Sequence, residues 1–149
     1  CDCAKILQID GKKPLPFSAA FDWVLVDAPC SGLGTLRRDP DIRWKRSAAD
    51  LTGLAVSQAA LLTSAAEVVT LGGRIVYATC SSEPEENEQV VEKFLANTPG
   101  FTIERPIVSP LRDLVGSDGY FRTLPYRDEL EGFFAVVLRR NGAGRTNLQ

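Results

Sequence analysis

The chain has 149 residues, enough for one domain with a hydrophobic core and too few for two ordinary domains. Its net charge of −2 and lack of histidine exclude a uniformly basic nucleic-acid binder and any catalytic site that needs a histidine base. No stretch approaches the roughly 20 apolar residues of a membrane span and no signal peptide opens the chain, so we expect a cytoplasmic protein with reduced thiols and no membrane partner.

The first half of the chain predicts a short opening strand, followed by two apolar strands that are joined by a helix. Residues 4–10 predict a short strand, and residues 21–26 and 73–78 are continuous apolar runs, typical of parallel strands covered on both faces of a sheet. Between these runs, residues 47–71 carry apolar side chains at helical spacing, and the glycines at 72–73 are predicted to end the helix. Strand, helix and strand of these lengths form one crossover unit.

A second helix is predicted after the strand at residues 73–78. Ser82 would be its N-cap, and Glu85, three residues later, would complete a capping box. The apolar spacing ends near Pro99, and residues 101–105 predict a further strand. The acidic run from Glu83 onwards is interpreted as a helix N-terminus favoured by the helix dipole, without a further function.

The C-terminal third predicts a loop and one last strand. Residues 106–131 are rich in proline, glycine and charge, and residues 132–140 are strongly apolar. We expect an α/β fold with a partial Rossmann-like sheet that lacks the opening strands and the Gly-rich turn of a nucleotide-binding domain. Residues 1–140 would form this domain, and the polar tail 141–149 is expected to be disordered.

Cys30 and Cys80, two of the four cysteines, directly follow the two apolar strands. Ligands bind at the carboxyl edge of open α/β sheets, so both thiols are expected at one site; inert buried thiols are the alternative. The predicted helix N-terminus after Cys80 would lower the pKa of its thiol, although the glutamates of that turn oppose the effect. Without histidine or a C-x-x-C pair, no metal site is expected.

Three segments are similar to one known family. They read FDWVLVDAPCSGLGTLRRDPDIRW, GGRIVYATCSSEPEENEQVV and GFFAVVLRR, and lie within residues 8–140. Together they resemble the Sun/Nop2 family of RNA 5-methylcytosine methyltransferases, above all the bacterial 16S rRNA enzymes, and DAPCSG with TCS at this separation is specific. The resemblance implies the C-terminal portion of a class I methyltransferase domain, with a mostly parallel sheet, an antiparallel last strand, S-adenosylmethionine as cofactor and RNA, chiefly rRNA, as substrate.

The resemblance also implies roles for individual residues. Cys80 would attack C6 of a flipped-out cytosine, because C5 of an aromatic pyrimidine becomes nucleophilic only after an adduct breaks the conjugation. Cys30 would help to release the methylated product, and Asp27 would hydrogen-bond the cytosine. Asp10, Asp27 and Pro29 would contact the cofactor, although a simple Asp-Gly turn explains Asp10 equally well.

A basic segment follows the cysteine edge. Its predicted RNA-binding residues are Arg37, Arg38, Arg43, Trp44, Lys45 and Arg46. The basic side chains would hold phosphates while the tryptophan stacks on a base or ribose. The alternative is a solvated loop in which the tryptophan packs on its own scaffold.

The sequence departs from the family in two ways. The Gly-rich loop and acidic strand end that precede the matching region in full-length members are absent. Half of the cofactor site is therefore expected in a missing N-terminal part of the same protein. Glu131 and Tyr126 stand where the family usually has aspartate and histidine. A non-catalytic RNA-binding half-domain is the alternative, whereas a thiol redox or acyl-transfer protein is disfavoured by the missing histidine and C-x-x-C pair.

Overall fold

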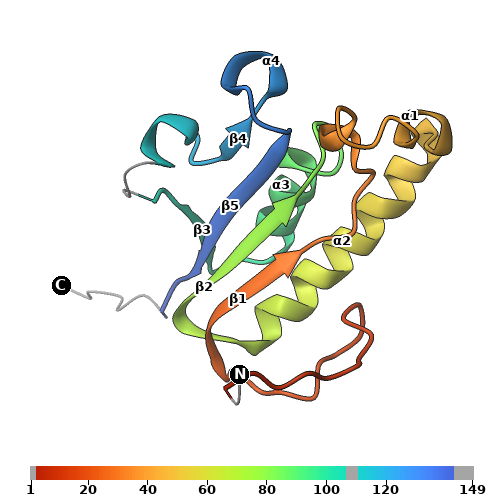
Figure 1. Cartoon of the computed structure of the whole chain (residues 1–149). Helices are drawn as coiled ribbons and strands as arrows, with labels where there is room; N and C mark the ends of the chain where they lie inside the picture. Colours follow the sequence, from red (N-terminus) through yellow and green to blue (C-terminus); the bar gives the residue numbers. More distant parts are fainter. Residues whose placement is uncertain (1–2, 107–110, 143–149) are drawn as a thin grey trace.

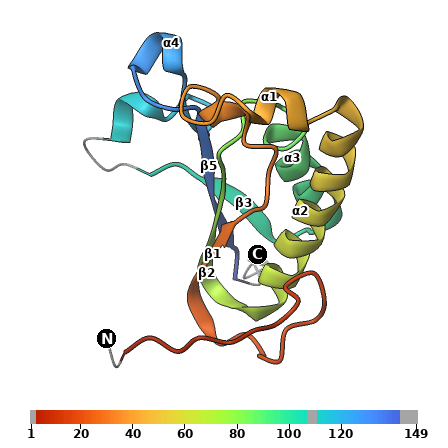
Figure 2. The ribbon, with the colours of Figure 1, turned by 45° about the vertical axis from the view of Figure 1, so that its right-hand side comes forward.

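The computed structural model describes residues 3–106 and 111–142. A five-stranded sheet forms one layer, and α2 and α3 form a second layer on one of its faces (Figure 1, Figure 2). The strands are β1 (Phe21–Asp27), β2 (Val69–Thr79), β3 (Phe101–Glu104), β4 (Phe121–Thr123) and β5 (Phe133–Arg140). The helices are α1 (Ile42–Lys45), α2 (Ala48–Val68), α3 (Glu88–Asn97), α4 (Pro125–Asp128) and the 3-10 turns η1 (Leu33–Thr35) and η2 (Leu111–Leu114).

The sheet has the strand order β1-β2-β5-β3, and β4 pairs with the remaining length of β5. β1 and β2 are parallel, whereas β5 runs antiparallel to β2, β3 and β4. Among the described strands, β5 alone runs against the others. This arrangement confirms the predicted α/β sheet, mostly parallel with an antiparallel last strand.

The core lies between the sheet and the two long helices. Leu62 of α2, Val91 of α3, Ile75 and Tyr77 of β2, and Leu138 of β5 are completely buried there. Each such side chain contributes about 1.5–3 kcal/mol when it leaves water. The contact between the helical layer and β2 and β5 is therefore the main source of stability.

The other face of β1 is open in the part of the chain that the structure describes. Phe21, Trp23 and Leu25 alternate along this face and are 39%, 59% and 68% exposed, whereas Val26 faces the core and is buried. The prediction that both faces of this strand are covered is wrong for the described residues. A continuous apolar run cannot by itself show whether a second covering layer is present.

Residues 4–10 do not form the predicted strand. The segment is irregular, and Ile6 and Leu7 are 97% and 60% exposed. A strand needs a neighbour for its backbone hydrogen bonds, and no described strand adjoins this segment. It continues instead past the C-terminal half of α2, where the Ser64 hydroxyl donates to the carbonyl of Lys13 at 3.2 Å.

α2 ends earlier than predicted, and β2 begins at the next residue. The pairing of β2 with β1 skips residues 70–73 between Val69 and Arg74, so these residues bulge from the ladder. Gly72 has a φ of 79°, a conformation that glycine adopts without strain. The glycine pair therefore shapes an irregularity within β2 and does not end the helix.

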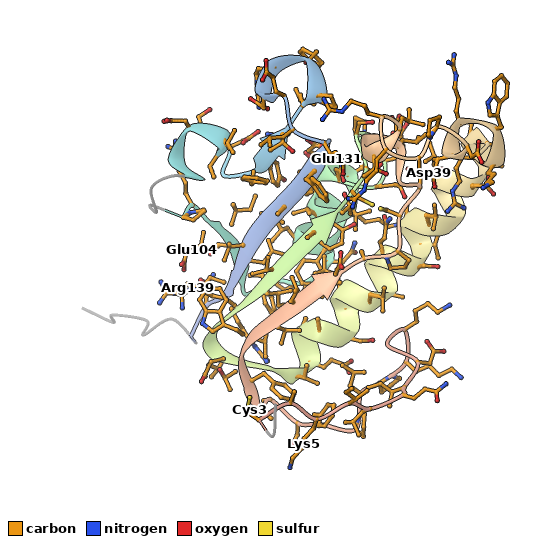
Figure 3. The ribbon with its side chains drawn as sticks, viewed as in Figure 1. Cys3, Lys5, Asp39, Glu104, Glu131 and Arg139 are labelled. Carbon is orange, nitrogen blue, oxygen red and sulfur yellow. The ribbon has the colours of Figure 1, made fainter. Side chains whose placement is uncertain are left out.

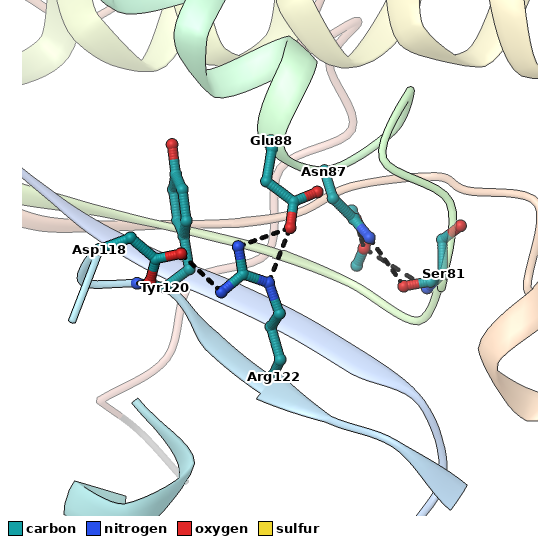
Figure 4. Close-up of polar contacts among 7 residues, drawn as sticks. Ser81, Asn87, Glu88, Asp118, Tyr120 and Arg122 are labelled. Carbon is teal, nitrogen blue, oxygen red and sulfur yellow. Dashed lines mark hydrogen bonds and ion pairs between the residues drawn. The ribbon is translucent and has the colours of Figure 1, made fainter. Parts of the chain in front are cut away.

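Residues 106–131 are more ordered than the predicted loop, because β4, η2 and α4 lie within them. The Arg122 guanidinium of β4 bonds to Glu88 of α3 at 2.7 Å and to Asp118 at 2.9 Å (Figure 4). It also lies 4.9 Å from the ring centre of Tyr120. The contact with Glu88 joins segments 34 residues apart, so local composition cannot predict it.

The sequence predicts no membrane segment, yet α2 is long and apolar enough to cross a bilayer by length and mean hydropathy. In this structure it lies against the sheet. Leu62, Ala65 and Ala66 pack into the core from one side of the helix. The crossover role of α2 accounts for its apolar composition without a membrane.

Gly34 supports a testable prediction about stability. Its N–H donates to the Cys80 carbonyl at 3.1 Å, and its carbonyl accepts the N–H of Gly132 at 2.8 Å. A Cβ at this position would clash with the Gly132 carbonyl and lie 2.9 Å from the Cys80 carbonyl oxygen. We expect Gly34→Ala to lower the free energy of unfolding by about 1–3 kcal/mol in urea denaturation.

Gly53→Ala is the matched control, because a Cβ at Gly53 in α2 would meet open space. We expect this change to raise the free energy of unfolding by about 0.5–1 kcal/mol. Equal stability of Gly34→Ala and the wild type would show that the loops do not approach so closely in solution.

Candidate functional site

The loops that follow β1 and β2 meet at the carboxyl edge of the sheet. The strands end level, since Asp27 pairs with Ala78. The Sγ atoms of Cys30 and Cys80 lie 3.0 Å apart, and the N–H of Cys80 donates to the Cys30 sulfur at 3.3 Å. Both side chains are half-buried. The structure thus brings together the two cysteines that the sequence places at corresponding strand ends.

The environment of Cys30 keeps this thiol protonated. Burial first, and then the hydrogen bond and electrostatic interaction with Cys80, raise the pKa of Cys30 to about 12. The backbone N–H groups of Gly32 and Cys80 act in the opposite direction with smaller effect. The Cys30 thiol therefore keeps its proton at neutral pH while its sulfur contacts that of Cys80.

A buried carboxylate, Glu86, joins the two cysteine loops. One oxygen accepts the N–H of Ser31 at 2.9 Å and the side-chain amide of Gln58 at 3.0 Å. The other accepts the hydroxyls of Ser31 at 2.5 Å and Ser81 at 2.6 Å. The sequence interpretation missed Glu86, because the acidic run around it resembles an ordinary helix N-terminus.

α3 begins at Glu88, so the predicted N-cap at Ser82 is wrong. The Ser82 hydroxyl donates to the Glu83 carboxylate at 2.9 Å instead of capping a helix. The residues in between form turns that direct Glu86 toward the cysteine loops. Cys80 consequently has no helix N-terminus next to it, because α3 begins eight residues later in the chain.

Side chains from β2 hold the turn before α3. The Tyr77 hydroxyl, whose pKa is raised mainly by burial, donates to the carbonyl of Glu86 at 2.6 Å. The Thr79 hydroxyl donates to the Asn87 side chain at 2.5 Å, and the Asn87 amide donates to the carbonyl of Ser81 at 2.9 Å (Figure 4). The position of Glu86 is therefore set by β2 itself.

Asp27 and Pro29 lie at the same edge, and both are exposed. The Pro29 carbonyl accepts the Gln58 amide at 3.0 Å. Their exposed surfaces are available to a cofactor or a base. Of the predicted cofactor-binding residues, these two lie at the cysteine edge.

Asp10 lies elsewhere. Its carboxylate accepts the backbone N–H of Lys12 at 3.1 Å and lies 3.8 Å from the ammonium group of Lys13. Lys13 in turn contacts Ser64 near the end of α2, whereas the start of α2 is the end next to the cysteine loops. The structure does not bring Asp10 to the cysteine edge, which agrees with the simple Asp-Gly turn.

The predicted RNA-binding segment borders the cysteine loops and contains α1. The Arg46 guanidinium donates to the carbonyl of Ser31 at 3.2 Å. Arg38 lies 3.8 Å from Glu131, which places this segment beside the loop before β5; Figure 3 shows Asp39 and Glu131 at this end of the molecule. The segment is therefore positioned at the candidate site and not remote from it.

The remaining side chains of this segment are accessible. Trp44 is 84% exposed, which contradicts the alternative that it packs on its own scaffold, and the Arg43 guanidinium lies 5.9 Å from the centre of its ring. Lys45 lies 3.9 Å from Asp41, and Arg37 is exposed. Ion pairs at such distances between exposed groups are weak and easily exchanged for a phosphate.

The arrangement offers a thiol pair, an exposed carboxylate and a basic segment at one sheet edge. Within residues 3–106 and 111–142, no group of His, Cys, Asp and Glu side chains is placed to hold a metal ion.

The sequence matches a family model described as 16S rRNA methyltransferase RsmB/F over residues 1–139. It is 41% identical to the ribosomal RNA small subunit methyltransferase B of Klebsiella pneumoniae over 142 residues, which cover 93% of this chain and 31% of that protein. It is 38% identical to the corresponding protein of Vibrio vulnificus over 137 residues, covering 91% and 30%. The chain spans about 30% of the length of these curated relatives.

Two solved structures share the fold. NSun6 from Pyrococcus horikoshii, determined with SFG, has a TM-score of 0.76 at 28% identity, covering 93% of this chain and 35% of that chain. A methyltransferase homologue from Pyrococcus horikoshii has a TM-score of 0.64 at 29% identity, covering 82% and 40%. They confirm the class I methyltransferase fold, of which this chain covers a part. The chain belongs to the 16S rRNA methyltransferase RsmB/F family.

Proposed function

We propose that this chain is the C-terminal part of an RNA cytosine-C5 methyltransferase that acts on rRNA through a covalent bond between Cys80 and C6 of cytosine. The 3.0 Å contact between the sulfur atoms of Cys30 and Cys80 is the observation that carries the proposal. It lies at the carboxyl edge of the sheet, where ligands of α/β folds bind. Family membership supports rRNA as the substrate, and an rRNA substrate supports a cytoplasmic location.

Cys80 is the nucleophile in this proposal. Its thiolate forms a bond to C6, and the electron pair of the C5–C6 double bond moves to C5, which then accepts a methyl group. Because burial and the contact with Cys80 raise the pKa of Cys30, we assign the attack to Cys80 and not to Cys30.

Cys30 assists release of the product. After methylation, C5 loses its proton to a base, the C5–C6 double bond re-forms, and the electrons of the C6–S bond return to the sulfur of Cys80. The Cys30 thiol stabilises this departing thiolate by donating a hydrogen bond to it. Asp27, exposed at the same edge, accepts a hydrogen bond from the cytosine amine.

The described residues fit S-adenosylmethionine only in part. Asp27 and Pro29 expose surface at the cysteine edge, but Asp10 lies near the far end of α2. The cofactor supplies the methyl group when it is bound, and NSun6, solved with the S-adenosylmethionine analogue SFG, supports its class. We assign the remaining contacts of the cofactor to an N-terminal part of the same protein.

The exposed apolar residues support an interface with this N-terminal part of the protein. Trp23 and Leu25 on the open face of β1, and Ile6 before it, are each at least 59% exposed. Large exposed apolar patches mark surfaces that another layer covers. The relatives extend well beyond the matched region, which is about 30% of their length. The upstream part would cover this face and complete the cofactor site.

The basic segment is the proposed RNA contact. Its members are Arg37, Arg38, Arg43, Trp44, Lys45 and Arg46. They border the cysteine loops, and Trp44 has an exposed ring on which a base can stack. Phosphate contacts of this kind position the RNA strand without reading its sequence.

Alkylation of the thiols tests which cysteine keeps its proton. Because burial and Cys80 raise the pKa of Cys30 to about 12, we expect iodoacetamide at neutral pH to label Cys80 well before Cys30. Labelling of Cys30 should rise with pH throughout the range in which the protein stays folded. Peptide mass spectrometry measures both labelling rates. Faster labelling of Cys30 than of Cys80 at neutral pH would contradict the raised pKa of Cys30.

A trapping experiment tests the nucleophile. Fluorine at C5 cannot leave as a proton does, so the complete gene product with S-adenosylmethionine should form a lasting adduct with RNA containing 5-fluorocytosine. We expect Cys80→Ala to abolish the adduct and to reduce turnover on the order of 10³-fold or more.

The control for trapping is Cys3→Ala, since Cys3 is exposed and lies at the end of the molecule away from Asp39 and Glu131 (Figure 3). It should form the adduct like the wild type. An adduct that persists in Cys80→Ala would eliminate Cys80 as the nucleophile. Normal RNA binding without an adduct in the wild-type protein would favour the non-catalytic alternative.

Cys30→Ala tests the release step. Without the thiol donor, the bond between Cys80 and C6 should persist, so the protein–RNA adduct should accumulate on ordinary RNA. Denaturing gel electrophoresis detects it as a slower band that the wild type lacks. Rapid turnover without such a band would show that Cys30 has no part in release.

A further inference from the structure

Each cysteine of the pair is followed by a serine, and both serines contact the same carboxylate oxygen. The hydroxyls of Ser31 and Ser81 lie 3.2 Å apart and donate to Oε2 of Glu86 at 2.5 and 2.6 Å. All three residues are at most 2% exposed. Glu86 thus reaches both cysteine loops at the residue directly after the cysteine.

The backbone also donates to both serine hydroxyls. The hydroxyl of Ser31 accepts the N–H of Leu33 at 3.3 Å, and that of Ser81 accepts the N–H of Glu83 at 3.1 Å. A hydroxyl has one proton, so each serine directs that proton to Glu86. With the Ser31 N–H and the Gln58 amide on Oε1, the carboxylate accepts four hydrogen bonds.

A buried carboxylate of this kind requires one arrangement of its donors. Burial of a negative charge is strongly unfavourable unless hydrogen-bond donors replace the lost water. The donors come from the loop after β1, the loop after β2 and α2, so the charge is satisfied only when all three are in place. Displacement of either serine would also displace the cysteine that directly precedes it in the chain.

We propose that Glu86 is a positioning residue whose carboxylate holds the loop after β1 against the loop after β2, and thereby keeps the sulfur atoms of Cys30 and Cys80 in contact. Its importance for methyl transfer rests on the proposed function, whereas its effect on the thiol pair does not. A misplacement of about 1 Å in such a pair can reduce a rate on the order of 100-fold.

Glu86→Gln tests the proposal with little change in volume. The amide can accept at one end only, so at least one pair of donors loses its acceptor. The sheet edge keeps other contacts, including the N–H of Ala28 to the carbonyl of Ala78 at 3.0 Å, so the variant is expected to fold. Glu85→Gln is the matched control, because the neighbouring Glu85 side chain is exposed.

The readout is cross-linking of the two thiols in the 149-residue chain with Cys1 and Cys3 replaced by serine. Dibromobimane becomes fluorescent only when two nearby thiols displace both bromides. We expect the parent and Glu85→Gln to react at equal rates and Glu86→Gln to react about tenfold more slowly or worse. Circular dichroism checks the fold, and peptide mapping identifies the linked residues.

A folded Glu86→Gln that cross-links at the parent rate would overturn the proposal. If this variant does not fold, Ser31→Ala and Ser81→Ala replace it, since each removes one donor from Oε2; parent rates in both would overturn the proposal equally. The assay contains neither RNA nor cofactor. Fast cross-linking of the parent chain without RNA trapping in the complete protein would reject the proposed function and leave the role of Glu86 intact.

Discussion

The parallel pairing of β1 with β2 is the constraint on which the rest of the site depends. Because Asp27 pairs with Ala78, both strands end at one edge, and the next residues of each chain segment form adjacent loops. α2 connects these strands and supplies the core contact that holds them in this register. The short distance between Cys30 and Cys80 follows from this geometry and from the hydrogen bonds that join the loops.

Two sulfur atoms in contact are chemically unequal. Burial and the contact with Cys80 raise the pKa of Cys30, and the N–H of Cys80 donates to the Cys30 sulfur. Such a pair suits a reaction in which one sulfur both attacks and leaves. Under the proposed function, the same inequality gives different roles to two residues that look equivalent in the sequence.

The sequence predicts most of the site because its signals there are local. Apolar runs that precede Cys30 and Cys80 indicate the strand ends, and the parallel arrangement then brings the thiols together. The structural role of Glu86 is different, since its partners Ser31 and Gln58 are far away in sequence. A glutamate before a helix is usually a favourable charge near the dipole, so nothing local separates this one from its neighbours.

The incorrect predictions share a physical reason. Residues 4–10 and the outer face of β1 have strand-like apolar patterns, yet the described residues offer them no partner strand or covering layer. The local sequence pattern indicates that a segment can form a strand. Whether the strand forms depends on the presence of a neighbouring strand or covering layer. The ordered segment around Arg122 shows the opposite case, in which an ion pair with the distant Glu88 helps to organise a stretch with loop-like composition.

The central claim is that Cys80 bonds to the cytosine while Cys30 does not. Mass spectrometry of the complete protein after trapping on RNA with 5-fluorocytosine, followed by nuclease and trypsin digestion, tests this claim most directly. The nucleotide mass is predicted on the tryptic peptide 75–93, at Cys80. Attachment to the peptide that contains Cys30, with Cys80 unmodified, would contradict it.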